Sequence, residues 1–82
     1  KYVQIFPNPG TTKVDLAIEN DHQGEVYVQF LSVLGNELQR HQLQKTGDSL
    51  VKTFDTSFFA PGLYLVKVRF GNITVTKKWI RY

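Results

Sequence analysis

Residues 63–80 read LYLVKVRFGNITVTKKWI, and they contain two apolar runs on either side of Gly71-Asn72. Apolar residues recur at every second position in each run, which is typical of a β-strand with one buried face. A Gly-Asn pair between two such runs indicates a tight two-residue hairpin. The register then pairs residues on one largely apolar face: Phe70 with Ile73, Val68 with Val75, Val66 with Lys77, and Tyr64 with Trp79.

We expect this face of the hairpin to be core, with Tyr64 and Trp79 as buried cross-strand neighbours. Lys77 is the one misfit on the face, and either a position at the rim or a bulge near Lys77-Lys78 would accommodate it. The opposite face is mixed and is expected to be solvated. The hairpin therefore predicts a β-sheet that covers a core on one side.

The same period of two extends through the rest of the chain, where Gly, Pro and Asn mark the turns. It predicts five further strands, at residues 2–6, 12–19, 25–31, 37–43 and 49–54. The segment at 37–43 is too polar for a central position and is expected at a sheet edge. Seven short strands without helical periodicity predict an all-β, seven-stranded antiparallel immunoglobulin-like β-sandwich. A small open barrel is the structural alternative.

Length and composition limit the chain to one small domain, residues 1–82, with 41% hydrophobic residues and no cysteine. The absence of cysteine excludes disulfides, a thiolate nucleophile and cysteine-ligated metals. No run is apolar enough for a transmembrane helix. Because the chain has no methionine, we expect it to be a fragment of a larger protein. The net charge of +3 is uneven, since the last 22 residues carry five cations and no acid.

Residues that could support catalysis do not form a recognised pattern. His22 and His41 lie in polar segments with no second ligand at metal-binding spacing, so we expect both to be solvated surface histidines. The serines have no nucleophile-elbow setting, and the acidic residues around 15–25 fit no calcium-loop template. We therefore expect no enzyme activity, no metal and no cofactor.

Two kinds of binding module were compared with the pattern. A nucleic-acid site needs aromatic rings and cations on one face, but the hairpin register places Trp79 on the core face and most C-terminal cations on the other. We expect no nucleic-acid partner. A carbohydrate module would need exposed aromatics, for which Phe58, Phe59 and Tyr82 are the candidates. Phe58-Phe59 is more simply explained as a plug at one end of the sandwich.

Four motifs occur in a fixed order along the chain: Phe6-Pro7-Asn8-Pro9, then residues 33–38 (VLGNEL), then Phe54-Asp55 leading to residues 60–66 (APGLYLV), and last Gly71 followed by residues 75–80 (VTKKWI). In this order and spacing they resemble the type A C-terminal sorting domain of the type IX secretion system. The resemblance covers essentially all 82 residues.

The resemblance implies a secreted cargo protein of a bacterium of the Bacteroidetes group. In that family the cargo reaches the periplasm, and the outer-membrane machinery recognises the sorting domain and translocates the protein. A sortase then commonly cuts upstream of the domain and attaches the cargo to the cell surface. The implied partners are the translocon and sortase components and the N-terminal cargo domain of the same chain, and the implied location is secreted or at the cell surface.

Site residues are carried over from the family by position. Residues that shape the fold would be Pro7, Asn8, Pro9, Gly35, Asp55, Gly62, Tyr64 and Gly71. The recognition strand would contain Lys77, Lys78, Trp79, Ile80, Arg81 and Tyr82, with Trp79 where the family usually has an aliphatic residue. The rival hypothesis is an immunoglobulin-like accessory module that binds carbohydrate or protein and is appended to a secreted enzyme.

Overall fold

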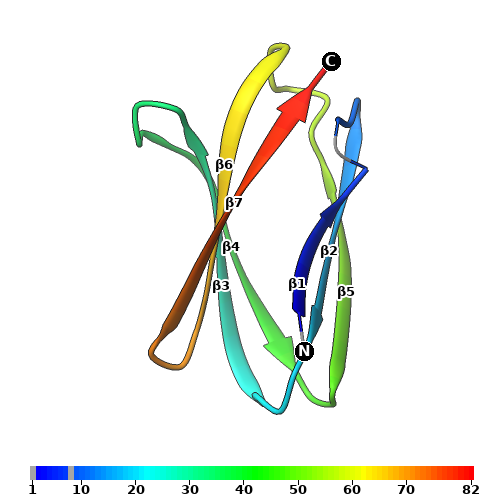
Figure 1. The fold of residues 1–82 in the computed structure, drawn as a ribbon, viewed down its shortest axis with the longest axis vertical. Coiled ribbons are helices and arrows are strands. Elements are labelled where there is room, and N and C mark those ends of the chain that lie inside the picture. Colours follow the sequence, from blue (N-terminus) through cyan, green and yellow to red (C-terminus); the bar gives the residue numbers. More distant parts are fainter. Residues whose placement is uncertain (1, 8) are drawn as a thin grey trace.

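A computed structural model describes residues 2–7 and 9–82. All seven predicted strands are present, and their ends differ from the predicted ones by at most two residues. The described part of the chain contains no helix that could cross a membrane. In chain order (Figure 1) the strands are β1 (Tyr2–Phe6), β2 (Lys13–Glu19), β3 (Gly24–Ser32), β4 (Glu37–Lys45), β5 (Ser49–Asp55), β6 (Gly62–Phe70) and β7 (Ile73–Arg81).

The strands form two antiparallel sheets that face one another (Figure 1). One sheet has the order β1-β2-β5 and the other has the order β4-β3-β6-β7. In a constant-type immunoglobulin domain the fourth strand joins the sheet of the first, second and fifth strands. Here β4 pairs with β3 instead, so the fold is an immunoglobulin-like β-sandwich with its fourth strand in the larger sheet. The prediction that residues 37–43 lie at an edge is confirmed.

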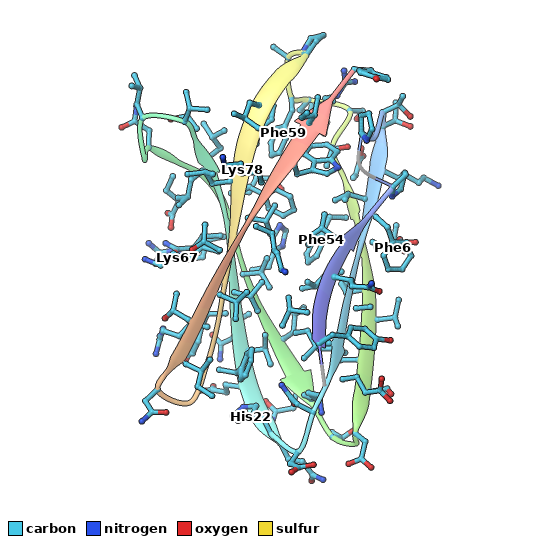
Figure 2. The ribbon with its side chains drawn as sticks, in the orientation of Figure 1. Phe6, His22, Phe54, Phe59, Lys67 and Lys78 are labelled. Atoms are coloured by element: carbon cyan, nitrogen blue, oxygen red, sulfur yellow. The ribbon has the colours of Figure 1, made fainter. Side chains whose placement is uncertain are left out.

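The core lies between the two sheets because each strand turns every second side chain inward. Figure 2 shows Phe54 and Phe59 in this space, whereas Lys67 points away from it. Full burial of one such apolar side chain contributes roughly 1.5–3 kcal/mol. The buried cluster consists of Val3, Val14, Leu16, Ile18, Val26, Val28, Phe30, Phe54, Phe59, Val66, Val68, Phe70 and Trp79.

The β6–β7 hairpin has the predicted register along its whole length, from Phe70 opposite Ile73 to Tyr64 opposite Trp79. Gly71 has a φ of 60°, and Asn72 does not have a positive φ, which fits a type II′ turn with glycine first. The ladder contains no bulge, and Lys77 is exposed at the rim. The predicted core face is therefore incomplete on β7.

Exposure on β7 follows from its place at the edge of the four-stranded sheet. The facing sheet has three strands and leaves part of the inner side of β7 uncovered. Ile73 is 52% exposed although it lies on the predicted core face, while Trp79 on the same face is fully buried. The prediction of a core face is confirmed for Val66, Val68, Phe70 and Trp79, whereas Tyr64 and Val75 are only partly buried and Ile73 is exposed.

Candidate functional site

The predicted recognition strand is β7, and one of its two edges pairs with β6. The other edge is covered near the C-terminal end by Gly10, which forms a parallel bridge with Arg81. The Gly10 amide donates to the Ile80 carbonyl at 2.8 Å, and the Tyr82 amide donates to the Gly10 carbonyl at 2.8 Å. Before this bridge, no described strand is hydrogen-bonded to the outer edge of β7.

Trp79 is a core residue and offers no accessible surface to a partner. Its ring centroid lies 6.1 Å from that of Tyr64 and 6.5 Å from that of Phe59. The indole nitrogen donates a 2.9 Å hydrogen bond to the carbonyl of Pro7, which satisfies its polar atom inside the core. Trp79 therefore connects the C-terminal strand to the proline segment after β1.

The other residues of the recognition strand are presented in two ways. Arg81 is partly buried, and its Nε donates to the Thr56 carbonyl at 3.0 Å while its Nη1 donates to the Tyr82 carbonyl at 2.8 Å. Ile80 and Tyr82 are 43% and 71% exposed. The guanidinium of Arg81 thus fixes the end of the strand through two carbonyl groups.

Lys77 and Lys78 are both exposed and lie at the edge of the sandwich that faces β1. They line a shallow pocket together with Val3, Gln4 and Ile5. Lys78 points to the outer side of the larger sheet, as Lys67 does, whereas Lys77 points toward the gap between the sheets. Because Lys77 and Lys78 are consecutive residues of β7, their side chains lie on opposite faces of the sheet.

The residues expected to shape the fold occupy turns and strand ends. Pro7 supplies the carbonyl that Trp79 binds, Pro9 is exposed before Gly10, and Asn8 lies outside the described residues. Gly35 and Gly71 have φ values of 91° and 60°, in the region that side chains rarely adopt. Gly62, with a φ of 155°, begins β6.

Asp55 and Tyr64 flank the loop between β5 and β6. The Asp55 carboxylate accepts the Ser57 amide at 2.9 Å. Hydrogen bonds from the side chain and backbone of Ser57 hold the pKa of Asp55 below its ordinary value. The Tyr64 hydroxyl donates to the Ala60 carbonyl. Both side chains therefore stabilise the loop conformation.

Two predictions about side chains around this loop and on β4 were wrong. Phe59 is buried and plugs the end of the sandwich, but Phe58 is 84% exposed. His41 is partly buried rather than fully solvated, and the centroid of its ring lies 4.5 Å from that of Phe54. The register of β4 with β3 turns His41 inward opposite Val28, and the signal was its alternation with Gln39 and Leu43.

Lys45 is a structural residue that the pattern assigned to a loop. It is 1% exposed. Its ammonium group donates to the carbonyls of Asn20 and His22 at 2.9 Å each and to that of Gly47. Within the described ranges no three histidine or acidic side chains converge as metal ligands.

The family comparison covers the segments that build this site. Residues 4–81 match the model of the secretion system C-terminal sorting domain. The chain belongs to this family. The sorting domain is a signal of type IX secretion, and it directs export across the outer membrane, to the medium or to the cell surface. A search of curated proteins finds no match.

Family membership also relates the domain to its partners. A sorting domain interacts with the type IX secretion machinery. In this domain the candidate contact is the edge strand β7 with its exposed cations. The edge of β7 and the two lysines lie on the surface of the folded sandwich, so a partner reaches them without unfolding the domain.

Proposed function

We propose that β7 is the recognition element of a single sorting domain, residues 1–82, which forms part of a larger secreted protein. The observation that carries this proposal is the exposure of two consecutive lysines, Lys77 and Lys78, on an edge strand. An edge strand can accept a further strand through its backbone. The two cations would select an acidic surface of the translocon.

The domain acts in this proposal as an address and as a substrate rather than as a catalyst. The cargo domain of the same chain precedes it, and a sortase cuts between the two after translocation and joins the cargo to the cell surface. Support for a contact made by the folded domain comes from the tether between Gly10 and Arg81, which fixes the end of β7 against the rest of the sandwich.

Export of a reporter tests the sorting role directly. The 82 residues are fused behind a periplasm-directed reporter in a bacterium that has type IX secretion. We expect the reporter at the cell surface or in the medium, because the domain supplies the signal. Retention of a folded, normally expressed reporter in the periplasm would overturn the sorting role of this chain.

Charge reversal tests the recognition element. The double variant Lys77→Glu, Lys78→Glu should fold, since exposed substitutions usually change stability by less than ~0.5 kcal/mol. It should lose export because an acidic partner would repel it. The control is Lys13→Glu, Lys52→Glu, which makes the same change in net charge on exposed lysines of the smaller sheet.

A comparison of the two double variants distinguishes recognition through the charges of the lysines from recognition through the shape or backbone of the strand. Loss of export in the first variant and normal export in the control support recognition through Lys77 and Lys78. Binding of the isolated domain to the machinery should then weaken with salt, since exposed charges are screened beyond ~8–10 Å at physiological ionic strength. Normal export of the folded first variant would contradict the electrostatic contact and leave the backbone edge as the recognition mode.

A further inference from the structure

Large apolar side chains are exposed at one end of the sandwich, the upper end in Figure 1. This apolar end comprises the turn between β3 and β4, the loop between β5 and β6, and the neighbouring strand ends. Exposed large apolar side chains gathered at one end of a small domain often mark a binding site, and two of these, Leu38 and Phe58, line the same pocket. Its members, with their exposed fractions, are Val33 (55%), Leu34 (85%), Leu38 (45%), Phe58 (84%), Leu63 (41%) and Tyr82 (71%).

The opposite end, called here the polar end, consists of the turns at residues 20–23, 46–48 and 71–72. These turns contain Asn, Asp, His, Gln, Thr and Gly and carry no large apolar side chain. β1 begins at the polar end (Figure 1), so a cargo domain that precedes residue 1 would connect there. The apolar end would then point away from the cargo.

The two most exposed side chains of the apolar end are held on ordered turns. Leu34 lies in a turn where the Gly35 amide donates to the Ser32 carbonyl and the Ser32 amide to the Asn36 carbonyl, each at 2.9 Å. Phe58 lies in a turn closed by the Phe59 amide, which donates to the Thr56 carbonyl at 3.0 Å. A partner would therefore meet apolar groups already fixed in place, which lowers the entropy cost of binding.

Phe58 also forms one wall of a pocket of about 310 Å3. Leu38 and Tyr64 form other walls, and the buried ring of Phe59 contributes to the lining. A pocket with aromatic walls beside a protruding ring is suited to a nonpolar side chain of a partner. Such anchor pockets usually supply most of the affinity of a protein interface.

Charges at the apolar end favour a protein over a lipid surface. Its cation Arg81 is engaged with the carbonyls of Thr56 and Tyr82. Glu37 and Asp55 border the end, and hydrogen bonds from Gln29 and Arg40 to Glu37 and from Ser57 to Asp55 lower the pKa of both carboxyls. The second cation near this end, Arg40, forms an ion pair with Glu37 at 3.1 Å. Interfacial membrane binding depends on cations available around the apolar surface, whereas here both arginines are engaged and Asp55 adds a negative charge.

We propose that the apolar end is a second docking surface, which binds an uncharged apolar patch on a protein of the secretion machinery and receives one of its nonpolar side chains between Phe58 and Leu38. Depletion of charge and enrichment in aromatic residues are typical of the centre of a protein interface. The proposal rests on the sorting function, and it adds a contact that is independent of the cations on β7.

The test uses the reporter fusion with Leu34→Ser, Phe58→Ser and, as the matched control, Tyr2→Ser, Val51→Ser. The control residues are 46% and 63% exposed and lie outside both the apolar end and β7. We expect export of the first variant to fall about tenfold, as for loss of a central aromatic anchor, and export of the control to equal that of the unmodified fusion. Both should keep the melting temperature of the parent, since all four sites are exposed.

Failure of the proposed docking surface can be told apart from failure of the sorting role. If the unmodified fusion is exported and the Leu34→Ser, Phe58→Ser variant is exported equally well, the docking surface is overturned while the sorting role stands. Two measurements on the purified chain test the occupant: flotation with phosphatidylethanolamine–phosphatidylglycerol vesicles, and sedimentation equilibrium. We expect neither vesicle binding nor dimers. Flotation or self-association that depends on Phe58 would overturn a protein of the machinery as the occupant.

Discussion

At the apolar end the space between the sheets is filled by the rings of Trp79, Phe59 and Tyr64, whereas at the polar end it is filled by the ammonium group of Lys45. The first arrangement is stabilised by removal of apolar surface from water. The second is stabilised by hydrogen bonds from one charge to three backbone carbonyls.

This difference explains why the two ends present different surfaces. The aromatic rings that fill the apolar end come partly from the loop between β5 and β6. In that loop Phe59 is buried, whereas the neighbouring Phe58 is exposed to solvent. At the polar end, the buried ammonium group of Lys45 needs backbone carbonyls from tight turns, and such turns consist of small polar residues. Only the apolar end therefore leaves nonpolar groups for a partner among the turns that the structure describes.

The largest effect should come from removing the ring that closes the apolar end. Trp79→Ala should cost about 3–5 kcal/mol of unfolding free energy, because it leaves a large cavity and an unpaired Pro7 carbonyl. That loss is comparable to the whole stability of a domain this small, so a large fraction of the molecules should be unfolded. Urea denaturation followed by far-ultraviolet circular dichroism measures it. Trp79→Phe keeps most of the packing and should lose less unfolding free energy. An unchanged urea midpoint for Trp79→Ala would show that this ring does not close the apolar end.

The matching change at the polar end is Lys45→Met. We expect a loss of about 2–3 kcal/mol, because three carbonyls lose a charged donor while the buried stem is largely replaced. Lys52→Met is the control, since Lys52 is exposed and its loss should change stability by less than ~0.5 kcal/mol. Equal stability of the two variants would mean that Lys45 does not close the polar end.

Sequence patterns predicted the β-sandwich because apolar alternation indicates which residues share a face of a strand and that one face is apolar. The register of β6 with β7 followed from Gly71-Asn72, and it holds over every pair. Lys45 was missed because the predicted strand ended at Leu43 and Lys45 was assigned to the following loop, although its position alternates with His41 and Leu43 on the inner face of β4. The carbonyls that compensate its burial belong to turns distant in sequence, so no local pattern reveals them.

The sequence also did not predict which residues of the candidate site are exposed. A strand's alternation tells which residues share a face, but how far the facing sheet extends is a property of the assembled sandwich. That extent decides that Trp79 is buried while Ile73 and Lys77 on the same face are exposed. The contact of Gly10 with β7 likewise joins residues about seventy positions apart, and the chain around it contains no strand pattern.

A smaller effect should follow from a methyl group at the tether of the apolar end. A Cβ on Gly10 would lie 2.8 Å from Cζ2 of Trp79 and 3.0 Å from the Pro7 carbonyl oxygen. Since the indole is buried and cannot swing away, Gly10→Ala should cost about 1–3 kcal/mol. Gly47→Ala at the polar end is the control, because nothing lies within 4 Å of the added atom. Thermal unfolding of both variants compares them, and equal melting temperatures would contradict close packing of Gly10 on Trp79.

The smallest effect concerns His41, which lies on the same inner face of β4 as Lys45 but packs at a tilt against the ring of Phe54. Burial, and secondly the charge of Lys52, lower the pKa of His41 below its ordinary value of 6.5. The folded state therefore binds the proton less well than the unfolded chain, so this contribution to stability is complete above pH ~6.5 and is lost as the pH falls below it. His41→Phe should flatten the decline of melting temperature between pH ~7.5 and ~5.5, a window above the carboxylate titrations. Lys52→Gln should give an intermediate slope, since it removes one of the two causes and keeps the burial. A slope for His41→Phe as steep as that of the parent chain would mean that protonation of His41 does not oppose folding, and that the inner face of β4 tolerates a charge at this position as it does at Lys45.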